Sequence, residues 1–155
     1  MTATIDNRLA ELGITLPAPP APVASYVPYV VSGKLVFISG QVTLADGGLK
    51  YTGTVGRDLT LEDGQAAARL CAINVLAQLK AAAGGDLDKV KRCVKLGVFV
   101  NAVPGFAQHP EVANGASDLM LAVFGEAGRH ARAAVGAGSL PRNVAVEVEA
   151  VFELA

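Results

Sequence analysis

The segment Asn143–Leu154, NVAVEVEAVFEL, alternates apolar and polar side chains along most of its length. Alternation with a period of two is typical of a β-strand that buries one face and leaves the other open. The side chains expected on the buried face are Val144, Val146, Val148, Ala150 and Phe152, and those on the other face are Ala145, Glu147, Glu149 and Glu153. A strand of this kind needs a layer packed against it.

Other segments of the chain supply partner strands. Lys89–Asn101 alternates in the same way, with Val94, Leu96, Val98 and Val100 on one side and Cys93, Lys95 and Phe99 on the other. Apolar, β-branched runs also predict strands at Ala131–Gly136 and, as a hairpin around Ser32-Gly33, at Tyr26–Val31 and Lys34–Ser39. A weaker strand is expected over Leu49–Val55.

Two long stretches have helical periodicity. The first begins at Thr60, whose spacing from Asp63 predicts a capping box, and runs to Ala83 before Gly84-Gly85. The second is expected over Pro110–Ala127, closed by Gly128. The order of elements predicts an α+β fold with a mixed sheet and both long helices on one face.

The first part of the chain has a different composition. Residues 3–13 have helical spacing, and residues 15–22 contain four prolines, which favour an extended connector. We therefore divide the 155 residues into an N-terminal helix and Pro-rich arm, 1–22, and a single domain, 23–155.

Composition limits the partners that the chain can have. Charged residues make up 17%, against a usual share of about 25%, which indicates that part of the surface is covered in an oligomer. A net charge of −1, no tryptophan and 5% aromatic residues argue against nucleic acid as a partner. No apolar run is long enough for a membrane span, and no signal-peptide pattern is present, so we expect a cytoplasmic protein.

The cysteines and histidines do not predict a metal site. Cys71 and Cys93 lie in apolar surroundings and have no metal-type spacing with His109 or His130. Buried free thiols are the expected state of both cysteines, and no cofactor is expected.

Arg132 and Glu147 are the candidate functional pair, because the sequence places them on two apolar strands joined by a turn, which we expect to be neighbours. The forked guanidinium of arginine binds a carboxylate through two parallel hydrogen bonds, and a nearby glutamate can steer or deprotonate a water molecule. The alternative is a structural ion pair between Arg132 and either Glu147 or Glu149. The glutamates could also be solvated or could pair with Lys95 or Arg92.

An ordered set of motifs resembles the Rid family, also called the YjgF family. The set consists of Ser39-Gly40-Gln41 after an apolar strand, Asn114 in the second helix, Ala131-Arg132, and Leu140-Pro141 followed by residues 146–150, VEVEA. The resemblance spans roughly residues 21–154, and within the family this chain is most similar to a branch with longer chains. It implies a chorismate-mutase-like fold and a homotrimer with a ligand cleft at each subunit boundary.

The resemblance also implies an activity. Members of the family hydrolyse enamines and imines derived from amino acids, such as 2-aminoacrylate, to 2-keto acids and ammonia. Carried over by residue, Arg132 would bind the substrate carboxylate and Glu147 would hold the attacking water. Ser39 and Gly40 would contact the ligand, Tyr26 would form a wall of the cleft from a neighbouring subunit, and Asn114 would lie near its rim.

Several alternatives stay open. Tyr26 could be an ordinary interface residue, and His130, at a position where many relatives have proline, could be a surface or hydrogen-bonded residue. Ala133-Ala134 replaces the polar or thiol pair that often follows the anchoring arginine, so the chain could be a trimer that binds keto acids without turnover. Endoribonuclease activity, which is often attached to the family, is disfavoured by the lack of a basic stripe and of paired histidines.

Overall fold

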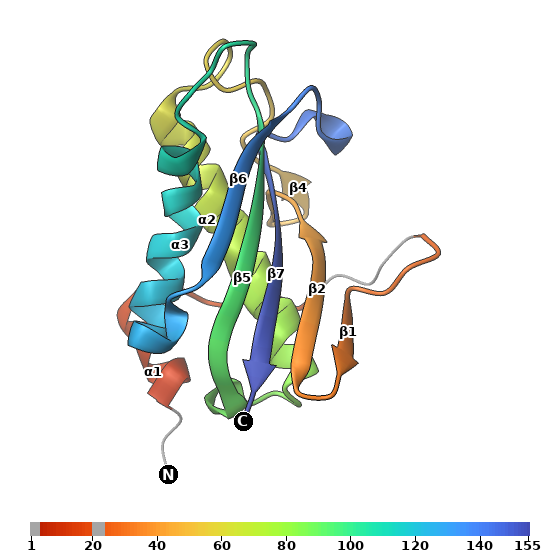
Figure 1. The fold of residues 1–155 in the computed structure, drawn as a ribbon, viewed down its shortest axis with the longest axis vertical. Helices are drawn as coiled ribbons and strands as arrows, with labels where there is room; N and C mark the ends of the chain where they lie inside the picture. The colour runs from red at the N-terminus through yellow and green to blue at the C-terminus, as the bar shows by residue number, and fades with distance from the viewer. Residues whose placement is uncertain (1–3, 20–23) are drawn as a thin grey trace.

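The computed structural model of the chain, which describes residues 4–19 and 24–155, has a five-stranded sheet with two long helices on one face (Figure 1). The strands are β1 (Tyr29–Ser32), β2 (Leu35–Gln41), β5 (Val90–Asn101), β6 (Ala131–Ala137) and β7 (Val146–Leu154). Their order is β1-β2-β7-β5-β6. The pair β5 and β6 is parallel and the other neighbours are antiparallel, which confirms the α+β class with a mixed sheet.

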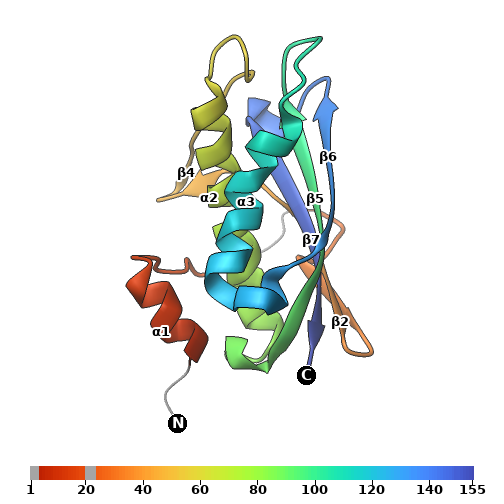
Figure 2. The same cartoon turned by 60° about the vertical axis from the view of Figure 1, so that its left-hand side comes forward.

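The two long helices, α2 (Leu61–Ala82) and α3 (His109–Phe124), lie side by side against the sheet (Figure 2). The predicted capping box is present: Asp63 N donates to Thr60 Oγ1 at 3.1 Å, and Thr60 N donates to Asp63 Oδ2 at 3.0 Å. Helix α3 ends at Phe124, three residues before the predicted end, because Gly125 has a φ of 63° and leads into the 3-10 turn η2 (Gly125–Gly128).

The core lies between the sheet and the helices. Val146, Val148, Ala150 and Phe152 of β7 are buried, as the alternation predicts. They meet Leu76 and Leu79 of α2 and Met120 of α3 in one apolar cluster. Full burial of side chains of this size contributes roughly 1.5–3 kcal/mol each, so this cluster fixes which face of each strand points toward the helices.

A β-bulge corrects the predicted face of Cys93. The pairing of β5 with β7 shifts register between Cys93 and Lys95, so that the alternation changes phase there. Cys93 is consequently buried opposite Phe152, on the same face as Leu96, whereas the even alternation placed it with Lys95.

The strand predicted over Leu49–Val55 is wrong, and the strand predicted from Asn143 begins later. Residues 44–49 form a small hairpin of two short strands, β3 (Leu44–Ala45) and β4 (Gly48–Leu49), and left-handed conformations at Tyr51 (φ 49°) and Gly53 (φ 134°) then turn the chain. Before β7 the chain forms the 3-10 turn η3 (Pro141–Asn143), in which Arg142 and Asn143 also have positive φ.

The N-terminal helix α1 (Thr4–Glu11) packs beside α3 (Figure 2). Both carboxylate oxygens of Asp88, in the turn η1 (Leu87–Lys89), accept hydrogen bonds of 3.0 Å from the backbone of α1, at Thr4 N and Ile5 N. Arg8 donates to the Val123 carbonyl at 2.9 Å. The predicted boundary at residues 22 and 23 lies outside the described residues.

The face of the sheet away from the helices is uncovered and rich in apolar side chains. Phe37 of β2 pairs with Val30 of β1 on one side and with Val151 of β7 on the other, and all three side chains lie on this open face. Val30, Phe37 and Val135 are 52%, 45% and 47% exposed. Large exposed apolar side chains that share one face of a sheet are typical of surfaces that contact other proteins.

Candidate active site

Arg132 lies on the edge strand β6 and points toward helix α3. It is paired with the buried Leu96, which places both side chains on the helix-covered face. Its Nη1 donates to Asn114 Oδ1 at 2.8 Å and to Ser117 Oγ at 3.1 Å. Asn114 and Ser117 are three residues apart on α3, so the helix presents both on one side. These bonds engage one nitrogen of the guanidinium, whereas a bidentate carboxylate would bind Nη2 and Nε.

His130 extends this polar cluster. Its Nδ1 is 2.6 Å from the Gly128 carbonyl oxygen, and its Nε2 is 2.8 Å from Ser117 Oγ. A carbonyl oxygen only accepts, so Nδ1 carries the hydrogen of the neutral ring and Nε2 accepts from the Ser117 hydroxyl. The hydrogen-bonded interpretation of His130 is therefore confirmed, and Ser117 joins it to Arg132.

A cavity of about 210 Å³ opens beside this cluster, lined by Ser117, Leu121, Arg129, His130 and Arg132. The Nε of Arg129 donates to both carboxylate oxygens of Glu126, at 3.1 and 3.2 Å. Among residues 4–19 and 24–155, by contrast, no carboxylate lies within ion-pair distance of Arg132. The cavity therefore presents a cation that a ligand carboxylate could neutralise.

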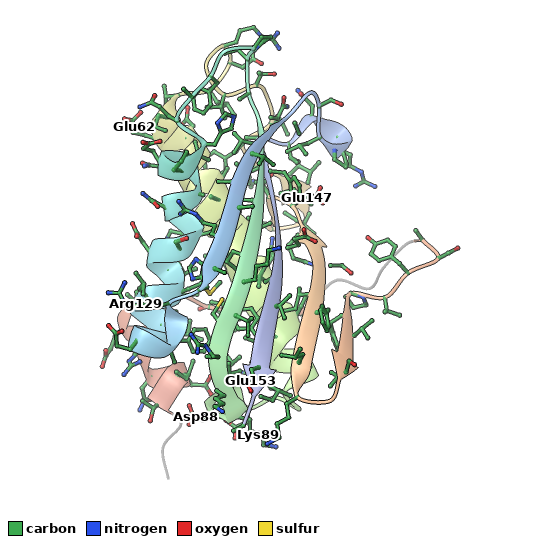
Figure 3. All side chains as sticks on the ribbon, viewed as in Figure 1. Glu62, Asp88, Lys89, Arg129, Glu147 and Glu153 are labelled. Atoms are coloured by element: carbon green, nitrogen blue, oxygen red, sulfur yellow. The ribbon has the colours of Figure 1, made fainter. Side chains whose placement is uncertain are left out.

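Glu147 lies on the open face of the sheet, opposite Phe99 (Figure 3). Its side chain lies across Gly40, where an added Cβ would overlap Glu147 Oε2 and stand 2.9 Å from Cδ. Burial raises the pKa of the Glu147 carboxyl, and the charge of Glu149 raises it further. Glu149 lies in the same way across Gly97, so both carboxylates share the open face, as the alternation predicts.

The expectation that Arg132 and Glu147 stand on neighbouring strands is wrong. Strand β5 lies between β6 and β7, and the two side chains point to opposite faces of the sheet. Strand β6 pairs with one side of β5, in parallel, and β7 pairs with the other side, antiparallel. The chain between β6 and β7 therefore passes from one side of β5 to the other. The structural ion pair of Arg132 with Glu147 or Glu149 is therefore excluded within one subunit. The glutamates do not pair with Lys95 or Arg92 either; the acidic residue of β7 that forms an ion pair is Glu153, with Lys91 at 3.8 Å.

The remaining predicted ligand contacts lie toward the other edge of the sheet. Ser39 Oγ donates to the Val27 carbonyl at 2.7 Å, which fastens the segment before β1 to the end of β2. Tyr26 lies in that segment and is 55% exposed. The predicted residues thus form two groups: Arg132 and Asn114 beside α3, and Tyr26, Ser39, Gly40 and Glu147 on the β2 side.

Sequence reasoning missed Ser117, which links Arg132 to His130. Its spacing of three residues from Asn114 on a predicted helix was the available signal. A further cavity of about 580 Å³, lined by Lys50, Tyr51 and Arg69 among others, lies between the β3–β4 hairpin and α2. In the described part of the chain, no three His, Cys, Asp or Glu side chains gather closely enough to hold a metal ion. No helix there combines the length and hydropathy of a membrane span.

Comparison with known proteins agrees with this fold. The family model described as "YjgF/chorismate_mutase-like, putative endoribonuclease" matches residues 6–154. Protein TCP17 of Trypanosoma cruzi is 56% identical over 148 residues, which are 95% of this chain and 92% of that protein.

Solved structures show the same likeness. The crystal structure of Atu1372, a protein of unknown function from Agrobacterium tumefaciens, is 51% identical, with a TM-score of 0.92 over 98% of this chain and 93% of that one. RidA from the Antarctic bacterium Psychrobacter sp. PAMC 21119 is 28% identical, with a TM-score of 0.60 over 88% of this chain and 94% of that one. The chain therefore belongs to the YjgF/chorismate-mutase-like family, the family of RidA.

Proposed function

We propose that this protein is a cytoplasmic deaminase that hydrolyses 2-imino acids of the 2-aminoacrylate type to 2-keto acids and ammonia. The observation that carries the proposal is the free side of the Arg132 guanidinium at a cavity, with no carboxylate partner in the described residues. A bidentate, charge-assisted contact there is worth on the order of 1.5–3 kcal/mol, enough to select a small organic acid.

The second part of the proposal is that the site is completed between subunits of a homotrimer. Arg132 is on the edge strand β6, whereas Gly40 and Glu147 lie on the β2 side of the sheet. A head-to-tail contact brings opposite edges of two copies together, and such contacts close into rings. The exposed apolar side chains of the open face supply a surface for this contact.

The reaction needs little more than placement of an anion and a water. An enamine tautomerises to an imine, whose carbon is already electrophilic. Arg132 of one subunit would hold the carboxylate, and Glu147 of a neighbour would accept a hydrogen bond from the attacking water. Removal of the proton that the attacking water gives up, by a positioned general base, contributes roughly 10²–10⁴-fold to the rate.

Mixing two inactive variants tests both parts. Arg132→Ala and Glu147→Ala are each expected to lose hydrolysis of 2-aminoacrylate generated by a lyase acting on serine. After joint refolding in equal amounts, about one quarter of the boundaries would pair an intact Arg132 with an intact Glu147, so about one quarter of the parent's activity returns. No rate gain of the parent over buffer would overturn the deaminase. No recovery on mixing would overturn the shared site, and light scattering tests the trimer itself.

A keto-acid-binding trimer without turnover is the second candidate. It is favoured by the separation of Arg132 from Glu147 within one subunit, because an anion site needs only the arginine. Thermal stabilisation by 2-oxobutyrate that depends on Arg132, with no imine hydrolysis, would establish this alternative.

A further inference from the structure

The side of the sheet that holds Arg132 carries its own proton-handling groups, and Glu147 is not among them. Ser117 and His130 both line the 210 Å³ cavity with Arg132. The hydroxyl of Ser117 touches both partners, accepting from Arg132 Nη1 at 3.1 Å and standing 2.8 Å from His130 Nε2. Ser117 is 8% exposed, so little water competes for these bonds.

The direction of each hydrogen bond follows from the donors present. Arg132 only donates, and the Gly128 carbonyl only accepts. A neutral His130 ring therefore holds its hydrogen on Nδ1, and the Ser117 hydrogen points to Nε2. The result is a single chain from the guanidinium through a hydroxyl to a basic ring nitrogen, with a backbone carbonyl fixing the ring.

We propose that Ser117 and His130 form a proton relay at this cavity, acting on the 2-imino acid whose carboxylate Arg132 binds. The inference rests on the proposed function and adds to it the groups that move the proton. Glu147 of a neighbour orients the water, and the Ser117–His130 relay carries the proton that the water gives up.

The proton balance of the relay is complete. The water oxygen forms a bond to the iminium carbon, and the π electron pair moves to nitrogen. The water proton passes to Ser117 Oγ while the hydroxyl proton moves to His130 Nε2. The reverse transfer protonates the nitrogen, and the C–N bond breaks with its electron pair leaving on ammonia. The hydroxyl that the added water formed on the carbon then gives its proton to the ammonia, which leaves as ammonium. One iminium and one water thus give one 2-keto acid and one ammonium.

The elements packed around His130 carry both positive and negative side chains. The charged side chains on these elements are Lys91, Arg92 and Lys95 of β5, Glu111 and Asp118 of α3, Glu126 of η2, Arg129 after it and Arg132 of β6. The guanidinium of Arg129 is engaged by Glu126, and Arg92 Nη2 donates to the Arg129 carbonyl at 3.4 Å. Arg132 is therefore the cation that Ser117 connects directly to the ring.

The test compares three variants of the full chain. His130→Gln keeps a polar side chain that cannot take up a proton, Ser117→Ala removes the relay oxygen, and His109→Gln is the matched control. His109 lies at the other end of α3, edge-on to Phe106. The measurements are kcat, KM and their pH dependence for imine hydrolysis, thermal stabilisation by 2-oxobutyrate, and the ¹⁵N NMR signals of the His130 ring.

We expect His130→Gln and Ser117→Ala to lower kcat by about 100-fold or more, with little change in KM or in stabilisation by 2-oxobutyrate. The pH profile of kcat changes shape in His130→Gln and keeps the parent's shape in His109→Gln. The NMR signals show hydrogen on Nδ1.

Two results would overturn the relay alone. One is a His130→Gln enzyme with the parent's kcat and pH profile while Arg132→Ala is inactive. The other is a ring with its hydrogen on Nε2. An inactive parent would instead overturn the proposed function, and the relay with it.

Discussion

Replacing Gly40 with alanine should displace the carboxylate of Glu147. An added Cβ would stand 2.9 Å from Glu147 Cδ and 3.2 Å from Cγ, and it would overlap Oε2. Ordinary contact begins at 3.4 Å, so Cδ must withdraw by about half an ångström and the carboxylate oxygen by more. The clash is with the end of a flexible side chain, so the fold yields easily and the loss of stability is small. Misplacement of a catalytic group by 1 Å can cost about 100-fold, and we expect kcat to fall by about 10-fold or more.

Gly97→Ala is the matched control, because its Cβ would meet Glu149 Cγ at 2.9 Å on the same face. It displaces the neighbouring carboxylate and leaves Glu147 in place. The assay measures kcat for 2-aminoacrylate hydrolysis together with thermal unfolding, so that a catalytic loss is separated from a loss of fold.

A double-mutant cycle decides whether Gly40→Ala acts through Glu147. In a Glu147→Ala background the overlapping atoms are gone, and Gly40→Ala should lower the residual rate no further. An equal loss in both backgrounds, or a larger loss from Gly97→Ala, would refute the reasoning.

Three further predictions concern stability and reactivity. Burial raises the pKa of Glu147 above its ordinary 4.5, so ionisation of this carboxyl destabilises the fold as pH rises through the raised value. The melting temperature of Glu147→Gln should therefore exceed that of the parent by an amount that grows from pH 4.5 to 7. A difference that stays constant with pH would contradict this. Gly115→Ala should lower stability by about 2 kcal/mol, despite a gain of roughly 1 kcal/mol in helix propensity, because its Cβ would meet the backbone of Gln65 in α2; an unchanged melting temperature would disprove the close packing. Burial raises the pKa of Cys93 to about 12 and that of Cys71 well above its usual range, so neither thiol should react with Ellman's reagent until the protein unfolds, and reaction in the native state would count against the buried placement.

Local patterns in the sequence determine the elements of this fold but not their spatial order. Alternation identifies the buried face of β7, and the Thr60–Asp63 spacing identifies the start of α2, because each depends on residues a few positions apart. The position of β5 between β6 and β7 depends on pairing between distant segments, which no local pattern records. The bulge at Cys93 is also set by the partner strand.

The same distinction applies to the candidate site. The sequence singled out Arg132 as an anion-binding residue and Asn114 as a residue near the same site. The structure joins the two side chains by a hydrogen bond. The role of Glu147 stays a prediction, because its face of the sheet is uncovered in a single subunit. Ser117 was missed because a serine inside an apolar helix has many structural explanations until a partner is placed beside it.

Arg132 and Glu147 lie on opposite faces of one subunit, so in the proposed ring the binding of ligand is coupled to the association of subunits. A metabolite that contacts two copies at once binds the associated form and not the separated chains. At a hundredfold excess over its dissociation constant it would strengthen each occupied boundary by about 2.7 kcal/mol. Specific activity would then fall on dilution and recover when ligand is added, so the small acid would act as a clamp between copies as well as a reactant.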